Sequence, residues 1–287
     1  MKGKGTLALV AALLSGCTTT NNTPDGAVAA ATAPGGTAIT YGNDSPRQFG
    51  ELRVPQGKGP FPVAMLVHGG CYLGIGSTEG FAPMAEWLRA RGVATWSISY
   101  RDLGSGMGYP NSFNDWASGL AKLKELAKQH PLDLARISVI GHSAGTTAAT
   151  WLASGSRGDG VLERDLPDIR AAVVLDGPVS LAEWIGIDER ICEKPVIVPF
   201  MGGTPAQVPA RYAMVDPRQT PLRIEELLVI DAALPAPLPD ALDAIRAKGT
   251  RVEVIKVSQT DHFALVKPGE ADFEAYAPTL LRIARGR

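Results

Sequence analysis

The feature that most constrains the fold is an alternation, from about residue 48 onward, of short apolar runs with longer amphipathic segments. Runs such as 63–67 and 171–175 are apolar at successive positions, which is typical of strands buried on both faces. The sequence therefore predicts an α/β fold: a doubly wound, mostly parallel sheet with helices on both faces. The expected strands are residues 63–67, 93–100, 137–140, 171–175, 227–230 and 251–257, and the expected helices are 78–91, 113–129, 144–152, 240–248 and 272–285.

Residues 176–221 break this alternation, because the segment is rich in proline and glycine. Open α/β sheets bind their ligands at the carboxyl ends of the strands. We therefore expect 176–221 to form a small cap over that end of the sheet.

The first residues carry a pattern typical of export. Lys2 and Lys4 precede an apolar run at 6–14 that is too short to cross a bilayer as a helix. The run ends in the sequence LSGC, which resembles the lipobox of bacterial lipoproteins. The resemblance implies cleavage before Cys17 and acylation of that cysteine. The alternative is an ordinary signal peptide with an incidental cysteine.

This pattern divides the chain into a signal peptide at 1–16, a flexible tether at 17–42 and a folded domain at 43–287. The tether is rich in small and polar residues and has too little large apolar surface to fold. We expect an exported protein that is lipid-anchored to a bacterial membrane through Cys17 and faces the periplasm or the exterior.

The charge balance excludes one class of partner. The chain has 28 basic and 29 acidic side chains and no run of like charge, so we expect no nucleic-acid partner. The four histidines are scattered and a CxxC pattern is absent, which gives a metal site no support. We expect neither a metal nor a cofactor.

Two cysteines remain once Cys17 is assigned to the anchor. Cys71 and Cys192 can pair in an oxidising compartment, but sequence alone does not show that they lie close together. The sequence leaves two possibilities open, a disulfide or two buried thiols.

The segment Gly141-His142-Ser143-Ala144-Gly145 matches the G-x-S-x-G nucleophile elbow. A β-branched run precedes it and a helix-forming run follows it. A serine on such a tight turn needs small neighbours, and the helix behind it stabilises negative charge. The alternative is a glycine-rich turn with a solvent-facing serine. We expect Ser143 to be a nucleophile.

The stretch His68-Gly69-Gly70-Cys71 follows the expected strand at 63–67. Acyl transfer develops an oxyanion, which backbone N–H groups stabilise. The glycines allow the loop to turn its amides inward. The N–H groups of Gly70, Cys71 and Ala144 are the expected oxyanion hole.

The general base follows by elimination among the histidines. His68 belongs to the oxyanion loop, His142 turns away from Ser143 by strand alternation, and His130 lies in a polar loop before a proline. His262 lies late in the chain, just after the expected strand at 251–257, at a strand's carboxyl end. We expect it to be the base.

The order HGG, GHSAG and a late DHF resembles the α/β-hydrolase superfamily, specifically its esterase-lipase and kynurenine-formamidase-like branch. The resemblance runs from about residue 45 to the C-terminus. It implies the α/β-hydrolase fold for 43–287, with Ser143 as nucleophile, His262 as base, and an oxyanion hole from Gly70, Cys71 and Ala144.

The acid of the triad departs from this resemblance. The family usually reads LLVHGxxD at the penultimate strand, whereas this chain reads LLVIDAALPAPLPD, with Leu234 where the aspartate belongs. Asp176, just after the strand at 171–175, is the expected acid. Three alternatives stay open: Asp231 at the end of the usual strand, Asp240, which is better suited to a helix N-cap, and no acid at all. Asp261, beside the base, is expected to be structural.

Other side chains receive structural interpretations. Arg101, Asp102 and Asp115 are expected to order the loop after the strand at 93–100. Tyr72 and Trp184 are the expected substrate contacts, being next to the oxyanion loop and in the cap. Core positions are the other interpretation of Trp184 and the expectation for Phe200, Met201 and Phe263.

These features predict a serine hydrolase that cleaves small carboxylic esters through an acyl-enzyme intermediate. One alternative is an N-acyl or formyl amide hydrolase, because a single sequence does not reveal the leaving group. Another is a non-catalytic lipoprotein that retains the fold, which the missing family aspartate would favour.

Overall fold

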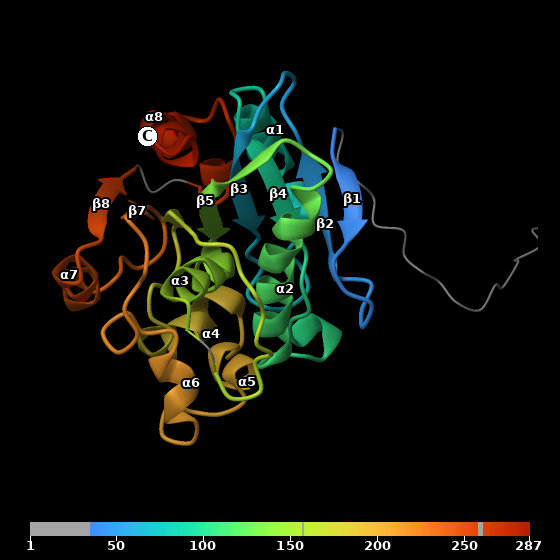
Figure 1. Cartoon of the computed structure of the whole chain (residues 1–287). Coiled ribbons are helices and arrows are strands. Elements are labelled where there is room, and N and C mark those ends of the chain that lie inside the picture. Colours follow the sequence, from blue (N-terminus) through green and yellow to red (C-terminus); the bar gives the residue numbers. More distant parts are fainter. Residues whose placement is uncertain (1–34, 157, 258–260) are drawn as a thin grey trace, which may run out of the picture.

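The computed structural model describes residues 35–156, 158–257 and 261–287. Its core is an eight-stranded sheet in the order β1-β2-β4-β3-β5-β6-β7-β8 (Figure 1). Strands β3 to β8 pair in parallel, while β1 and β2 add an antiparallel edge. The predicted α/β architecture is confirmed. The strands are β1 (Thr37–Thr40), β2 (Phe49–Arg53), β3 (Phe61–Val67), β4 (Ala94–Ile98), β5 (Leu132–His142), β6 (Ala171–Leu175), β7 (Glu226–Asp231) and β8 (Arg251–Lys256).

Side chains along the central strands alternate between two apolar layers. In β3, Val63, Met65 and Val67 join one layer, whereas Ala64 and Leu66 join the other. The first layer includes buried side chains of α2, α3 and α7, and the second those of α1 and α8 (Figure 1). Both faces are covered, as continuously apolar strands require. The helices are α1 (Ala82–Arg89), α2 (Asn111–Leu126), α3 (Thr146–Ser154), α7 (Pro239–Ala247) and α8 (Ala271–Ala284), with short 3-10 turns η1 (Thr78–Phe81), η2 (Leu103–Ser105), η3 (Ser143–Gly145), η4 (Ala182–Trp184) and η5 (Ala264–Val266).

The predicted tether extends too far, because its last residues include strand β1. Residues 37–40 fall within the expected tether at 17–42, yet Thr37 pairs opposite Leu52 and Thr40 opposite Phe49 of β2. The strand is short and mostly exposed, so it carries no apolar run that sequence could reveal. The folded domain therefore begins before residue 43. Cys17, the predicted signal peptide and the first part of the predicted tether lie outside the described residues.

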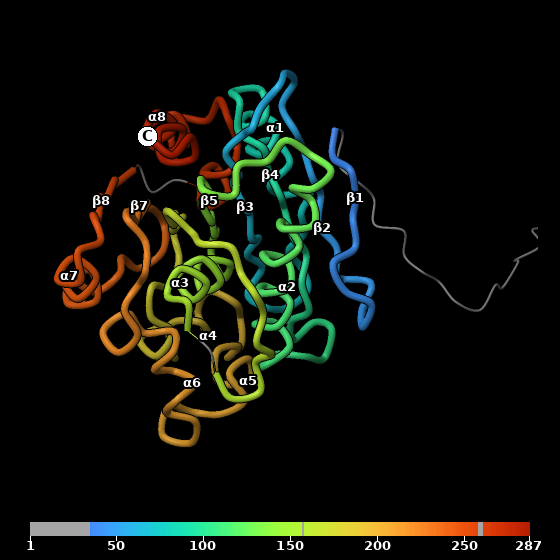
Figure 2. The backbone as a smooth tube through the Cα atoms, in the orientation of Figure 1, coloured from blue at the N-terminus to red at the C-terminus, as the bar shows by residue number. Residues whose placement is uncertain are grey.

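Residues 176–221 contain η4 and three short helices, α4 (Ile187–Cys192), α5 (Ile197–Met201) and α6 (Pro209–Ala213). Figure 2 shows the backbone of this segment, gold to orange, gathered at one end of the domain. Phe200 and Met201 of α5 are fully buried in the apolar layer that includes α2 and α3. The segment also borders the cavity beside Ser143, at the carboxyl end of β5, which is the place expected for the cap.

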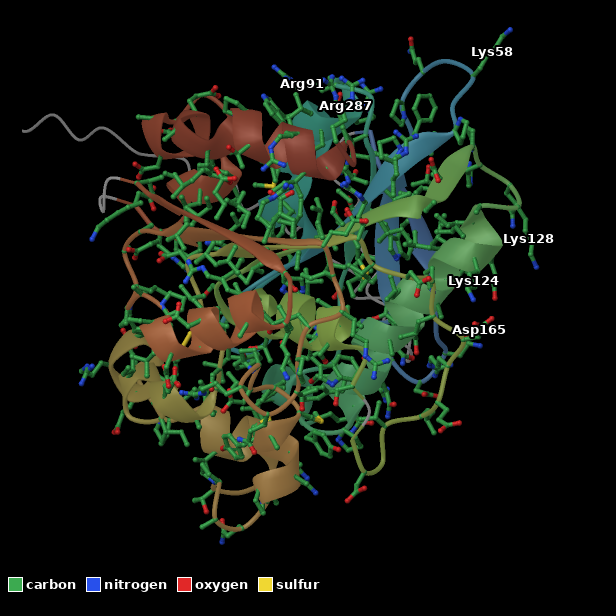
Figure 3. All side chains as sticks on the ribbon, turned by 60° about the vertical axis from the view of Figure 1, so that its left-hand side comes forward. Lys58, Arg91, Lys124, Lys128, Asp165 and Arg287 are labelled. Atoms are coloured by element: carbon green, nitrogen blue, oxygen red, sulfur yellow. A yellow bond between two sulfur atoms is a disulfide. The ribbon has the colours of Figure 1, made fainter. Side chains whose placement is uncertain are left out.

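The surface carries interleaved charges of both signs. Lys124 Nζ lies 2.6 Å from Asp165 Oδ1, and Figure 3 shows these two side chains close together at the edge of the molecule. Such exposed pairs contribute about 0–1 kcal/mol to stability. Within the described ranges, no helix combines the length and the apolar character needed to span a membrane.

One carboxylate at the amino end of the sheet is buried and doubly paired. Glu226 begins β7 and is 1% exposed. Its two oxygens accept hydrogen bonds of 2.6 Å from Arg282 of α8 and from Arg251 of β8. Burial alone would raise the pKa of Glu226, but these hydrogen bonds outweigh it and hold the pKa at about 2. The cluster therefore ties the last helix and the last strand to β7.

We expect Glu226→Gln to lower the free energy of unfolding at pH 7 by about 1–3 kcal/mol, because the variant loses hydrogen bonds between charged groups. The folded-state pKa lies below the ordinary value of 4.5, so this stabilisation is present above pH 4.5 and is lost as the pH falls toward 2. Urea denaturation across this range measures the difference between wild type and variant.

Glu125→Gln is the matched control, because Glu125 pairs with Lys122 on an exposed helix face and is expected to change stability by less than about 1 kcal/mol. A difference between wild type and Glu226→Gln that stays constant from pH 7 to 2 would contradict the role given to this carboxylate.

Candidate active site

Ser143 lies at a tight turn between a strand and a helix. Strand β5 ends at His142, and the turn η3 leads directly into α3. Ser143 has φ 54°, in the left-handed region that non-glycine residues rarely adopt. Strained backbone of this kind costs on the order of 1–3 kcal/mol and persists only where the surroundings fix it. The turn thus has the geometry expected of a nucleophile elbow.

The backbone around this turn is packed too closely for side chains. A Cβ on Gly145 would lie 2.1 Å from the carbonyl oxygen of Val67 in β3. A Cβ on Gly69 would lie 2.6 Å from the Cβ of Ser143. The small residues of both motifs are therefore required by contact between the two loops, which brings the loop after β3 against the serine.

His262 and Asp176 meet across the carboxyl end of the sheet. His262 Nδ1 donates a hydrogen bond of 2.6 Å to Asp176 Oδ2, since an ionised carboxylate can only accept. Asp176 directly follows β6 and is 3% exposed. With the proton on Nδ1, His262 Nε2 carries the lone pair that a general base needs.

The loop after β7 holds the other side of the Asp176 carboxylate. Backbone N–H groups of Ala232, Ala233 and Leu234 donate to it at 3.3, 3.1 and 3.0 Å. Burial alone would raise the pKa of Asp176, but the hydrogen bonds from His262 and from this loop outweigh burial and lower the pKa. Leu234, where the family pattern has its aspartate, thus contributes a main-chain donor in place of a carboxylate.

The alternative acids have other partners. Asp231 Oδ2 lies 3.8 Å from Lys256 Nζ of the neighbouring strand. Asp240 Oδ2 accepts a hydrogen bond of 2.9 Å from Arg218. Asp240 lies inside the first turn of α7, whose N-cap is Leu238, so the N-cap interpretation of Asp240 is wrong. The carboxylate that the structure brings to His262 is that of Asp176.

His142 packs against His262 and hydrogen-bonds its backbone. Its Nε2 donates a hydrogen bond of 3.0 Å to the carbonyl oxygen of His262, and the two ring centroids are 4.3 Å apart. Burial, together with the neighbouring His262, lowers the pKa of His142 to about 3. The imidazole of His142 is therefore neutral above that pH and acts as a packing and hydrogen-bonding partner.

The loop after β3 is fixed along its length. Tyr100 donates a hydrogen bond of 2.8 Å to the carbonyl oxygen of His68, and Gly74 donates one of 2.8 Å to Asp102. Gly70 has φ 105°, and Cys71 and Tyr72 have φ 54° and 58°. Three consecutive residues with positive φ reverse the chain beside Ser143.

The residues expected to order the neighbouring loop do so. Arg101 donates to both oxygens of Asp115, at 2.9 and 2.7 Å, and Asp102 caps η2 while holding Gly74. Phe263 differs from expectation, since its side chain is 60% exposed. Its N–H donates to Asp261 Oδ1, in a turn that contains His262.

Cys71 and Cys192 form a disulfide between the loop after β3 and the end of α4. Tyr72, the next residue, stacks on Phe200 of α5 with ring centroids 3.9 Å apart and hydrogen-bonds Thr147 of α3 at 2.7 Å. The cap is therefore attached to the loop after β3 at two successive positions. Sequence reasoning left the disulfide open and missed Thr147, because neither contact has a local signal.

A narrow cavity of about 30 Å³ opens beside Ser143. Tyr72 and Trp184, the expected substrate contacts, both line it. Asp188 of α4, which sequence reasoning missed, also borders it and accepts backbone hydrogen bonds within the cap. The lining residues are Cys71, Tyr72, Ser143, Ala144, Pro178, Trp184, Asp188, Ile191, Cys192, Val196, Ile197 and Leu234.

Residues of both predicted site motifs meet at this cavity. Ser143 and Ala144 come from the elbow, and Cys71 comes from the loop after β3. Gly70 precedes Cys71 in that loop and borders a second cavity of about 390 Å³, together with His68 and His142. In the described ranges, no group of three or more His, Cys, Asp or Glu side chains is arranged to hold a metal ion.

Comparison with known proteins gives a family match and a curated relative. A model of the BD-FAE family matches residues 52–220, more than half of the chain. Esterase EstD of Thermotoga maritima is 25% identical over 150 residues, which cover 50% of this chain and 36% of that protein. The matched part thus spans about a third of that curated relative.

Solved structures agree on the architecture. Esterase Est2 of Thermogutta terrifontis superposes with a TM-score of 0.65 at 18% identity, covering 86% of this chain and 89% of that one. Esterase B of Lactobacillus rhamnosis superposes with a TM-score of 0.67 at 14% identity, covering 88% and 87%. At these identities the likeness shows the fold, which is that of the α/β-hydrolases.

The kynurenine-formamidase-like branch and the lipoprotein signal stay predictions. The family match covers β3, the elbow, β6 and most of the cap, so it includes Ser143 and Asp176 but ends before His262. With the fold and this match together, the chain belongs to the BD-FAE family and has the α/β-hydrolase fold.

Proposed function

We propose that this protein is a carboxylic ester hydrolase that works through a serine acyl-enzyme. The observation that carries the proposal is the hydrogen bond of 2.6 Å between His262 Nδ1 and Asp176, together with the strained elbow geometry of Ser143, whose neighbour His142 packs on the His262 ring. A neutral imidazole held in this tautomer is the base that a serine nucleophile requires. The esterase names of EstD, Est2 and esterase B support the same reaction class.

In the proposed first step, Ser143 Oγ attacks the ester carbonyl while His262 Nε2 takes the hydroxyl proton. The N–H groups of Ala144, Gly70 and Cys71 stabilise the oxyanion. Collapse of the tetrahedral intermediate breaks the ester C–O bond, and His262 returns the proton to the leaving alcohol. A water molecule, deprotonated by the same imidazole, then releases the carboxylic acid and restores Ser143.

The buried walls beside Ser143 favour small acyl groups. The cavity there is bordered by Tyr72 and Trp184, which are 3% and 6% exposed, and by Leu234. Est2, which shares the fold, has been solved with butyrate and with propionate bound. We therefore propose small carboxylic esters as the substrate class.

We expect a fluorophosphonate probe to label the wild type and to fail on Ser143→Ala, because the probe reacts only with an activated serine hydroxyl. In Ser143→Ala, the rate of p-nitrophenyl acetate hydrolysis should fall close to the rate in enzyme-free buffer. The remaining difference is the acceleration that substrate binding alone provides. Mass spectrometry of the labelled peptide identifies the residue that carries the probe.

Ser77→Ala is the control, because Ser77 is exposed and should leave both labelling and hydrolysis unchanged. Hydrolysis of an N-formyl aromatic amine, assayed beside the ester, separates the two substrate classes. Equal labelling of wild type and Ser143→Ala would reject the proposed nucleophile.

We expect Asp176→Asn to lower kcat for the ester about 10³–10⁴-fold, because the amide no longer fixes the Nδ1–H tautomer of His262 or stabilises its imidazolium. Asp231→Asn is the matched control, since Asp231 contacts Lys256 and should lose no more than a few-fold. Steady-state kinetics of both variants measures the difference. Comparable losses in the two variants would remove the assignment of Asp176 as the acid.

We also propose that the mature chain is anchored to a bacterial membrane by acylation of Cys17, with the domain facing the periplasm or the exterior. The LSGC sequence at the end of the apolar run supports this proposal. Cells that express the full chain should incorporate an alkyne-labelled fatty acid into the wild type and not into Cys17→Ala. Label that persists in Cys17→Ala would show that the fatty acid is attached to another residue, and would contradict the proposal.

A further inference from the structure

We propose that the Cys71–Cys192 disulfide is a positioning element of the active site. It holds the loop that carries the oxyanion donors of Gly70 and Cys71 in its reactive conformation, and its reduction lowers kcat. The inference rests on the proposed function, because it concerns the oxyanion hole of the same site. In this proposal, a covalent bond from the cap sets the direction of the main-chain N–H groups beside Ser143.

The disulfide joins two walls of the same cavity. Cys71 and Cys192 both border the narrow space beside Ser143, although 121 positions separate them in the chain. Cys71 is also the residue whose own N–H is assigned to the oxyanion hole. Movement of its side chain therefore acts on the donor directly, with no intervening residue.

The conformation of the loop requires an external constraint. Cys71 and Tyr72 are consecutive non-glycine residues with φ 54° and 58°. Residues with side chains leave this region unless their contacts prevent it. Tyr72 is held through its ring, which stacks on Phe200 and hydrogen-bonds Thr147. For the side chain of Cys71, the corresponding constraint is the disulfide.

The other end of the disulfide is fixed within the cap. Cys192 ends α4, a helix of six residues, too short to be stable by itself. The carboxylate of Asp188, 4% exposed, accepts hydrogen bonds of 2.8 Å from the N–H groups of Gly186, Val196 and Ile197. These bonds close residues 186–197 into one unit, so that Cys192 is a fixed point to which Cys71 is attached.

Both cysteines are partly exposed, so a reductant can reach them. Reduction takes up two electrons and two protons, breaks the S–S bond and leaves two thiols. Dithiothreitol supplies both electrons and protons and becomes a cyclic disulfide. Once reduced, Cys71 can leave the left-handed region, and its N–H then turns away from the oxyanion.

The test uses the full-length protein with p-nitrophenyl acetate at 25 °C. Cys192→Ser breaks the disulfide without altering Cys71. We expect its kcat to fall about 10–100-fold with KM changed less than about three-fold, since loss of one oxyanion donor lowers kcat by about 10²–10³ and the loop still samples its original conformation. Wild type treated with dithiothreitol should match the variant, and reoxidation with oxidised glutathione should restore its kcat.

The double variant Cys71→Ser/Cys192→Ser is the control for the reductant. It should have the low kcat in either condition, because dithiothreitol has no disulfide left to break there. Circular dichroism at 25 °C verifies that each sample is folded. Should Cys192→Ser not fold, reduction and reoxidation of the folded wild type carry the test.

Three outcomes separate the claims. A folded Cys192→Ser, or a folded reduced wild type, that keeps the full kcat and loses only melting temperature would overturn the positioning role. An oxidised wild type that is active and is labelled at Ser143, combined with a low kcat on reduction that reoxidation restores, supports it. An oxidised wild type that neither hydrolyses the ester nor reacts with a fluorophosphonate would overturn both this inference and the proposed function.

Discussion

The close approach of two backbones at the carboxyl end of the sheet is the constraint on which the rest of the site depends. The turn at Ser143 packs against the carbonyl of Val67, and Gly69 packs against the serine itself, at distances that leave no room for a Cβ. Parallel pairing of β3 and β5 brings these loops to the same edge. Contact between them then places the serine and the loop after β3 together, before any side-chain chemistry is involved.

The sheet also explains how the acid can leave its usual strand. The strands β6 and β7 are neighbours and end side by side, so a carboxylate after either one can reach an imidazole that follows β8. In this chain Asp176 projects from the end of β6, and the loop after β7 supplies N–H donors to it. The carboxylate that accepts the hydrogen bond of His262 therefore follows β6, one strand away from the place that the resemblance implies.

Sequence patterns revealed the interior of the fold better than its edges. Strand β6 has the bounds expected from its apolar run, since every residue in it is buried. Strand β1 was missed and β5 begins five residues earlier than expected, because exposed or charged residues at those positions carry no apolar signal. The elbow and the late histidine were visible as local motifs. The pairing of Asp176 with His262 and of Cys71 with Cys192 depends on distances in space, which left alternatives open.

The main-chain hydrogen bonds to Asp176 have a consequence for how the site can vary. A loop that contributes N–H groups alone constrains the path of its backbone at 232–234 and requires no acid there, so that Ala232 can be buried and Leu234 can line the cavity. Any residue except proline offers the same donor. The end of the penultimate strand can therefore lack the acid that the resemblance implies, while the carboxylate of Asp176 still meets the imidazole of His262.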